Sequence, residues 1–250
     1  MLLTASGLKN DVLRSALADL LGKRFGAVRV VYVPTASVAT PGDHGWVVRN
    51  LNLLHGLGWR EFDLLELNGL PGQVVRQRLR HADVIYAEGG NHYHLANSIA
   101  ANGLGADLAD LLEERVYVGV SAGSMIFSKN LSRRTGEAFG EHDDLRILEQ
   151  AEPRSPVGLF DWYVKPHLNS RDFPGRNRAW FERSAARLDC PVYALDDDSA
   201  VRVRGDDVDV VSDGEWHLLN APEGAAAAIG PRASRAGTRW RRPPFLSVRR

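Results

Sequence analysis

Residues 116–127 read V-Y-V-G-V-S-A-G-S-M-I-F, and the predicted fold is built around this stretch. The apolar run 116–120 predicts a buried strand, and the apolar residues that follow Gly123 predict the start of a helix. Ser121 stands between the two elements, in the G-x-S-x-G spacing of a nucleophile elbow. The turn is so tight that a side chain at Gly119 or Gly123 would collide with the neighbouring strand or helix. The motif therefore predicts a serine exposed at the carboxyl end of a strand.

The G-x-S-x-G motif has a second interpretation. An ordinary glycine-rich turn, in which a serine caps the following helix, gives the same local pattern. The strand before Ser121 and the helix after it favour the elbow, because a nucleophile elbow requires that context. In an elbow, the amide of Ala122 would point to the position where an oxyanion forms.

Strands and helices alternate along the first half of the chain. Apolar, β-branched runs predict strands at 28–33, 60–67, 82–87 and 116–120, and helical spacing predicts helices at 10–22, 43–57, 71–80 and 104–114. This alternation predicts a doubly wound, mostly parallel sheet with helices on both faces. Loops rich in glycine or hydroxyl groups follow three of the strands, at 34–37, 88–91 and 119–123. Ligands bind beyond the carboxyl ends of such strands, so these loops predict a site.

The second half of the chain is less regular. Residues 132–156 are polar and predict a long loop, which in a compact domain is usually functional or disordered. Further strands are predicted at 158–167 and 191–195, a helix at 176–188, and a small antiparallel meander at the sheet edge over 199–218. We expect one α/β domain over 1–230 and an Arg- and Pro-rich extension over 231–250.

Composition excludes several classes of protein. The 250 residues contain 31 Lys and Arg and 31 Asp and Glu, so no net charge favours nucleic acid or a membrane surface. The single cysteine, Cys190, cannot form an internal disulfide, which fits a reducing cytoplasm. No apolar run has the length of a membrane helix, and the N-terminus does not have the pattern of a signal peptide. We expect a cytoplasmic protein with no cofactor, no metal, and no nucleic-acid or membrane partner.

A serine nucleophile needs a base, and His167 is the candidate. It follows an apolar stretch and Pro166, at the sheet edge where Ser121 should be exposed. His92 and His94 lie two positions apart near a helix start, so they face different directions and form a poor metal pair. From the residues alone, a core-edge histidine bonded to backbone is usually the better explanation of a lone histidine such as His167.

Several separated motifs resemble one family. The strings P-T-A-S, Y-A-E-G-G-N-x-Y-x-L, G-V-S-A-G-S-M-I-F-S and K-P-H-L-N, in this order, are similar to the dipeptidase E and cyanophycinase family of serine peptidases. The likeness covers residues 1–200. It implies a flavodoxin-like fold similar to class I glutamine amidotransferases, with serine in place of their cysteine. It also implies Ser121 as the nucleophile, His167 as the base, and the amides of Gly90 and Ala122 as an oxyanion hole.

The resemblance also implies an acid in the loop after the elbow. Glu137 is the candidate by spacing and Glu141 is the alternative, with Asp143 and Asp144 just beyond. The run 196–198 consists of three aspartates and is a weak candidate for a metal site. Consecutive side chains on a strand point to opposite faces, so this run is better explained as a turn.

The dipeptidase branch of the family binds an N-terminal aspartate through an arginine. Arg176 is the expected equivalent, with Arg171 and Arg178 as rivals, because a guanidinium binds a carboxylate through two parallel bonds. Asn169 and Asn91 are further candidates for contact with the substrate.

Three hypotheses for the activity stay open. The first is a serine exopeptidase that cleaves short peptides, above all dipeptides with an N-terminal aspartate. The second is a cyanophycinase-like hydrolase of β-linked Asp-Arg polymer, which would need a more open cleft. The third is a non-catalytic binding module on the same fold. A monomer and a homodimer are both compatible with the sequence.

Overall fold

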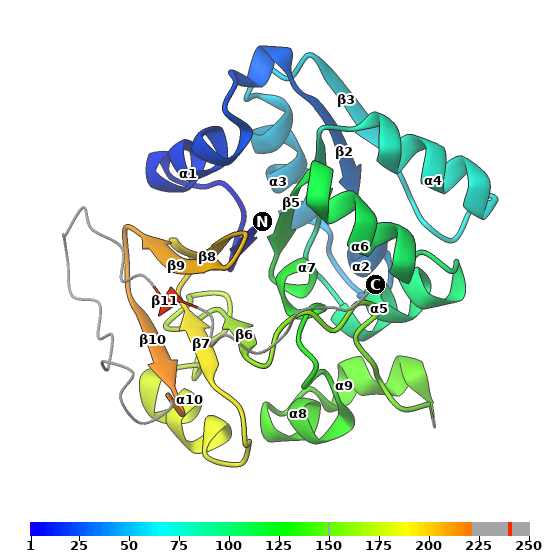
Figure 1. Cartoon of the computed structure of the whole chain (residues 1–250). Helices are drawn as coiled ribbons and strands as arrows, with labels where there is room; N and C mark the ends of the chain where they lie inside the picture. Colours follow the sequence, from blue (N-terminus) through cyan, green and yellow to red (C-terminus); the bar gives the residue numbers. More distant parts are fainter. Residues whose placement is uncertain (150, 222–239, 242–250) are drawn as a thin grey trace.

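The computed structural model describes residues 1–149, 151–221 and 240–241 (Figure 1). Its main sheet has eight strands in the order β11-β9-β8-β1-β5-β4-β2-β3. The strands are β1 (Leu2–Thr4), β2 (Arg29–Val33), β3 (Glu61–Leu64), β4 (Val84–Ala87), β5 (Val116–Val120), β8 (Ser199–Arg204), β9 (Asp207–Ser212) and β11 (Trp240–Arg241). Strands β1 to β5 pair with one another in parallel. Strands β8, β9 and β11 extend the sheet beyond β1 through antiparallel pairs.

Helices cover both faces of this sheet. On one face lie α1 (Asp11–Leu21), a short 3-10 helix η1 (Phe25–Ala27) and α3 (Gly45–His55); on the other lie α4 (Gly72–His81), α5 (His92–Ala101) and α6 (Gly105–Glu114). Alternate strand residues explain this layering, since Val30 and Tyr32 pack toward α1 while Val31 and Val33 pack toward α5 and α6. Both faces of the central strands β1, β2, β4 and β5 are therefore buried, as their apolar runs predict, whereas β3 and β9 are partly exposed.

The strand order reverses direction between β2 and β4. The chain passes from β2 outward to β3, then returns to the other side of β2 to form β4 and β5. The carboxyl ends at such a switch point border a crevice where ligands bind in doubly wound sheets. The loops after β2, β4 and β5 all lie at this edge, as the sequence predicts.

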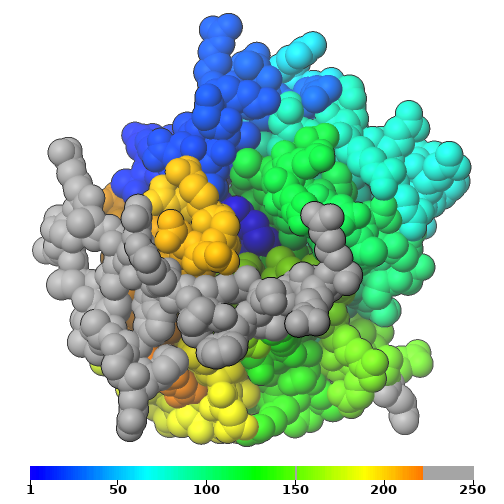
Figure 2. Space-filling model, in the orientation of Figure 1, coloured from blue at the N-terminus to red at the C-terminus, as the bar shows by residue number. Residues whose placement is uncertain are grey.

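A second, three-stranded sheet lies beside the first. It has the order β10 (Trp216–Leu219), β7 (Val192–Leu195), β6 (Tyr163–Pro166), with β6 and β7 parallel and β10 antiparallel to β7. The helix α10 (Arg178–Ala185) connects β6 to β7. Hairpin β8–β9 extends the main sheet beyond β1. In Figure 2 the start of the chain, in dark blue, reaches the surface between the orange segment and the green segments. The predicted fold class is thereby confirmed, including the antiparallel meander near the C-terminus.

Two predicted loops contain helices. Residues 34–37 form most of α2 (Thr35–Val38), a single turn closed by the Ser37 and Val38 amides on the Pro34 carbonyl. The elbow helix α7 (Ala122–Met125) is likewise one turn. In the polar stretch after it lie α8 (Arg133–Ala138), α9 (His142–Leu145) and the 3-10 helix η2 (Arg146–Leu148). Ser132 explains the start of α8, because its side chain accepts the Thr135 amide.

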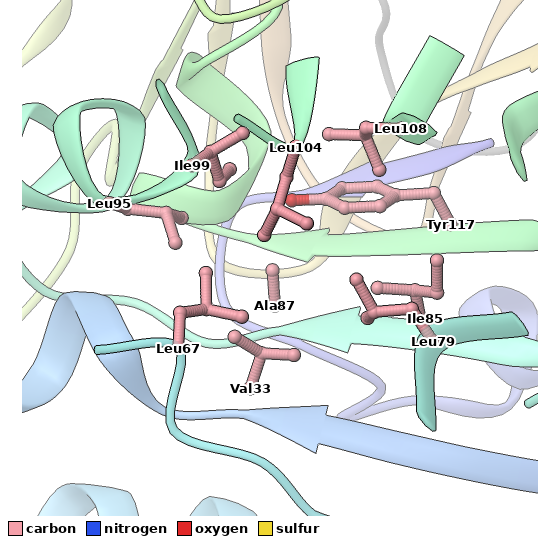
Figure 3. A pocket seen from close by; sticks show the side chains of 10 residues that line it. All are labelled: Val33, Leu67, Leu79, Ile85, Ala87, Leu95, Ile99, Leu104, Leu108 and Tyr117. Atoms are coloured by element: carbon pink, nitrogen blue, oxygen red, sulfur yellow. The ribbon is translucent and has the colours of Figure 1, made fainter. Parts of the chain in front are cut away.

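An apolar cavity lies between the sheet and the helices α4 to α6. Its volume is about 30 Å³, and Figure 3 shows side chains of the sheet facing side chains of the helices across it. A volume of this size holds about one water, but lining residues such as Val33, Leu95 and Leu104 offer it no polar partner. The cavity is therefore a packing defect of the core and not a ligand site.

The structure leaves two predictions open. The expected extension 231–250 lies outside the described residues except at 240–241, and the single domain over 1–230 stays a prediction. Within the described part of the chain, no helix has both the length and the apolar character needed to cross a bilayer.

Candidate active site

The backbone at Ser121 has an unusual conformation. Its φ is 46° and its ψ is −104°, which L-residues adopt only when the surrounding structure enforces it. The flanking glycines show how. A Cβ on Gly119 would lie 2.6 Å from the carbonyl carbon of Gly123, and a Cβ on Gly123 would lie 2.3 Å from the oxygen of Ala87. The strand, turn and helix approach each other closely at both positions, as the motif predicts.

The first strand holds the elbow in place. The amide of Ser121 donates to the Thr4 carbonyl at 3.0 Å, and the Ser124 hydroxyl donates to the same oxygen at 2.8 Å. The hydroxyl of Thr4 donates to the carbonyl of Gly119 at 2.7 Å. These bonds cross from β1 to both ends of the turn, so the strained conformation is fixed from outside.

His167 lies between Ser121 and a carboxylate. Its Nε2 is 2.9 Å from Ser121 Oγ, and its Nδ1 is 2.8 Å from Oδ1 of Asp197. The residue follows the last residue of β6 and has a φ of 73°. Burial lowers the pKa of His167, against the Asp197 carboxylate, which raises it. Arg176 and Lys165 lower it further, so the neutral imidazole is the favoured form.

Asp197 lies in the turn between β7 and β8. The preceding aspartate, Asp196, shapes this turn: its carboxylate accepts the amides of Asp198 at 3.1 Å and Glu215 at 2.5 Å. Asp197 itself also accepts the Ser170 hydroxyl at 2.7 Å. Burial would raise the pKa of Asp197, but the bonds from His167 and Ser170 hold it below its ordinary value. The carboxylate is therefore ionised beside the imidazole.

The structure places a different carboxylate beside His167 from the one that the sequence predicts. Glu137 is exposed on α8, and its carbonyl accepts a bond from Arg187 at 3.1 Å. Glu141 is buried, and its carboxylate accepts bonds from Lys165 and from the Tyr93 hydroxyl. Neither carboxylate contacts His167 among the hydrogen bonds of the described residues, whereas that of Asp197 does.

The pairing of β6 with β7 explains the position of Asp197. In the register of β6 and β7, Pro166 pairs with Leu195. His167 and Asp197 therefore follow the carboxyl ends of adjacent parallel strands, where side chains meet. The run 196–198 is a turn, as expected, but the turn brings one of its carboxylates to the site.

The loop after β4 lies against the elbow. A Cβ on Gly89 would be 3.4 Å from Cβ of Ser121, and a Cβ on Gly90 would be 2.3 Å from the Ala36 oxygen. Gly90 also has a φ of 129°, which favours glycine strongly. The double glycine therefore lets bare backbone pass between α2 and the nucleophile.

The predicted substrate contacts differ in what they touch. Arg176 is half-buried, and its guanidinium lies 4.1 Å from the ring centre of Phe173, which stacks on His167 at 4.4 Å. Asn169 is exposed and donates to Glu215 at 2.9 Å. Asn91 is buried and caps α5, accepting the His94 amide at 2.9 Å. The side chain of Asn91 thus holds a helix start and has little left for a substrate.

The rival arginines are more exposed than Arg176. Both Arg171 and Arg178 are exposed, and Arg178 pairs with Glu182 at 2.7 Å. Burial lowers the pKa of Arg176, while the carboxylates of Glu141 and Asp144 raise it. Arg176 is thus the arginine that belongs to the surroundings of His167.

A buried charged cluster lies behind Arg176. His92, Glu141 and Asp144 offer ligand atoms within 4.8 Å of one another, which is a spacing that could hold a metal ion. However, Glu141 already accepts a bond from the buried ammonium of Lys165, and its Oε2 is 3.4 Å from His92. These partners hold the pKa of Glu141 well below its ordinary value despite burial, which on its own would raise it. The cluster is explained as an ion-pair network with its own cation.

Comparisons with known sequences match this chain to one family of peptidases. The model of peptidase family S51 matches residues 1–211. Peptidase E of Shewanella baltica (strain OS185) is 25% identical over 203 residues, covering 77% of this chain and 78% of that protein. Peptidase E of Shewanella amazonensis is 32% identical over 154 residues, covering 58% and 60%. An uncharacterised peptidase of Listeria monocytogenes is 25% identical over 182 residues, covering 72% and 83%.

Solved structures show the same fold. A putative peptidase E from Listeria monocytogenes superposes with a TM-score of 0.68 at 21% identity, covering 84% of this chain and 96% of that one. A peptidase from an acI-B1 actinobacterium superposes with a TM-score of 0.62 at 18% identity, covering 96% and 93%. With the family model spanning most of the sequence, the conclusion is direct: this chain belongs to peptidase family S51 and is a serine-type peptidase similar to peptidase E.

Proposed function

We propose that the protein is an exopeptidase that hydrolyses dipeptides with an N-terminal aspartate through Ser121, His167 and Asp197. The observation that carries this proposal is the position of His167, 2.9 Å from the serine hydroxyl and 2.8 Å from the aspartate. Neutral His167 takes the proton of Ser121 as the hydroxyl attacks the scissile carbonyl. The imidazolium then gives this proton to the leaving amine, and Asp197 stabilises the imidazolium without accepting its proton.

Hydrolysis of the acyl-enzyme follows the same route in reverse. Water takes the place of the leaving amine and attacks the acyl carbon while His167 removes its proton; the imidazolium then returns this proton to Ser121 Oγ as the ester bond to the acyl group breaks. The amides of Gly90 and Ala122 donate to the oxyanion in both steps. In support, Ala122 begins α7 directly after the nucleophile, and the Gly89 backbone lies against Ser121. Removing one such donor typically costs about 3 kcal/mol of transition-state stabilisation.

Arg176 supplies the preference for aspartate. Its guanidinium is held over the Phe173 ring, and that ring stacks on His167. A half-buried guanidinium binds a carboxylate more strongly than an exposed one, because less water screens the pair. The side-chain carboxylate of an N-terminal aspartate fits this position chemically.

Hydrolysis of a dipeptide library by the wild type and by Ser121→Ala tests the proposal. The wild type should cleave Asp-X dipeptides faster than Asn-X dipeptides of the same shape, since only the former carry the charge for Arg176. Ser121→Ala should show no turnover above background and unfold at the same temperature as the wild type. Undiminished hydrolysis by Ser121→Ala would rule out the mechanism, and a preference for β-linked Asp-Arg substrates would rule out the proposed specificity.

A further inference from the structure

The peptide bond between Gly89 and Gly90 is fixed by a side chain from another loop. The Ser37 hydroxyl, on α2, donates to the Gly89 carbonyl at 2.7 Å across 52 positions of sequence. Ser37 is 1% exposed, so this bond is shielded from water. A buried hydroxyl–carbonyl bond of this length holds its carbonyl in one orientation.

Peptide planarity passes this restraint to the next amide. The Gly89–Gly90 peptide is trans, so the N–H of Gly90 points opposite to the carbonyl that Ser37 holds. A rotation of this plane would be cheap in a Gly-Gly pair, because neither residue has a Cβ that restricts it. The Ser37 bond therefore determines where the Gly90 amide points.

The neighbouring peptide plane is fixed as well. The Glu88 carboxylate is buried and accepts the Gly89 amide at 2.7 Å, the Tyr32 hydroxyl at 2.9 Å and the side chain of Asn50 at 3.3 Å. On the other side, the Asn91 amide donates to the Ala36 carbonyl at 2.9 Å. The amides on either side of Gly90, those of Gly89 and Asn91, therefore already have hydrogen-bond acceptors within the protein.

The helix that carries Ser37 is itself anchored. Thr35 is fully buried, donates to Glu66 at 3.0 Å and accepts the Leu67 amide at 3.1 Å. The backbone of Ala36 packs so closely on Gly90 that a Cβ there would have no room. Ser37 is therefore a rigid support and not a mobile surface residue.

We propose that Ser37 is a positioning residue for the oxyanion hole, which keeps the Gly90 amide directed at the oxyanion by holding the Gly89 carbonyl. This inference rests on the proposed function of Ser121 and Gly90. It assigns a role to Ser37, the serine of the P-T-A-S segment, which takes no part in the proposed triad.

The test compares Ser37→Ala with the wild type in two measurements. The rate constant for labelling by a fluorophosphonate probe should fall at least about tenfold, because the phosphonyl oxygen loses a directed donor in the transition state. With a dipeptide substrate, kcat should fall by a similar factor while KM stays unchanged, since the donor acts mainly on the transition state. Ser37→Cys retains the size and a weak donor, so its rates should lie between the two.

Thr135→Val is the matched control. The Thr135 hydroxyl is equally buried and donates to the Asn130 carbonyl at 2.6 Å, but it lies on α8, outside the loops at Ser121 and Gly90. Its loss should lower thermal stability without changing the labelling rate. Labelling of Ser37→Ala at the wild-type rate would overturn the positioning role of Ser37 and leave the proposed function intact. If Ser37→Ala does not fold, labelling of Ser37→Cys at the wild-type rate would overturn the positioning role in its place. Absence of labelling in the wild type would instead overturn the proposed function, and the positioning role with it.

Discussion

At the scale of single residues, the candidate site combines backbone strain with a histidine whose pKa is lowered. Both Ser121 and His167 have positive φ values, 46° and 73°, that their own side chains disfavour. Such conformations persist only where surrounding bonds enforce them, and they occur mainly at functional sites. Here the Ser121 amide donates to the Thr4 carbonyl, and the Leu168 amide, next to His167, donates to the Leu195 carbonyl.

The pKa of His167 predicts the pH dependence of hydrolysis. Only neutral His167 can accept the proton of Ser121, and burial, with Arg176 and Lys165, lowers its pKa against the opposing effect of Asp197. The value for kcat/KM should therefore be flat at neutral pH and fall only below the ordinary histidine range around 6.5. Arg176→Ala removes a cation that lowers this pKa, so its acid limb should move to higher pH.

Initial rates measured between pH 4 and 9 on the wild type and on Arg176→Ala would locate the acid limb of each enzyme. A wild-type limb above the ordinary histidine range, or a shift to lower pH in the variant, would contradict this account of the base.

The residues that the structure brings together differ in the sequence signals that they carry. Ser121 stands in a motif whose glycines have a steric reason, and His167 ends an apolar stretch after Pro166. Asp197 is 30 positions from His167 and has no local signal that distinguishes it from its two neighbours. Its contact depends on the pairing of β6 with β7, which is a tertiary feature.

At the scale of elements, α8 and α9 surround a buried ion pair. Lys165 on β6 is 1% exposed and Glu141, the residue before α9, is 6% exposed, so each depends on the other. Lys165→Met should destabilise the protein by about 3–5 kcal/mol, because it removes the buried ammonium that balances the charge of the Glu141 carboxylate. Lys129→Met, which breaks an exposed pair with Asp161, should cost less than about 1 kcal/mol.

The same pair predicts how stability varies with pH. The folded-state pKa of Glu141 is held below 4.5, so the stability from the pair is present above that value and lost as pH falls. The difference in the free energy of unfolding between the wild type and Lys165→Met should therefore be largest at neutral pH and become smaller in acid. Urea unfolding at several pH values measures it, and a difference that stays constant or grows in acid would contradict the pairing.

The short helices show where sequence patterns fail. A single turn such as α2 has no apolar periodicity to detect, and the polar stretch that forms α8 and α9 reads as a loop for the same reason. The longer elements were predicted correctly because their periodicity is strong. Helix α3 spans Gly45–His55 where the sequence predicted 43–57.

At the scale of the whole molecule, two apolar clusters share one sheet. Strand β4 contributes Val84 and Tyr86 to one cluster and Ile85 and Ala87 to the other. The larger cluster also includes Tyr163 and Val192 of the second sheet, so the layers are joined by packing. The alternation of strands and helices predicted this sheet, whereas the separation of β6, β7 and β10 into a second sheet has no sequence signal.

This shared core predicts cooperative unfolding. Tryptophan fluorescence and far-ultraviolet circular dichroism should give the same midpoint in urea, because neither cluster can be exposed without loss of the sheet. The measurement also tests the prediction of one domain over 1–230. Two midpoints that differ beyond experimental error would indicate separate folding units.

The central claim is that Asp197, and not Glu137, orients His167 toward Ser121. It is tested most directly by the rate of fluorophosphonate labelling at Ser121, located by mass spectrometry, in Asp197→Asn and Glu137→Gln. Loss of the carboxylate that orients a catalytic histidine typically costs about 10⁴-fold, so Asp197→Asn should lose most of its labelling. Glu137→Gln should label at the wild-type rate. The reverse result, with labelling lost in Glu137→Gln and retained in Asp197→Asn, would contradict the account.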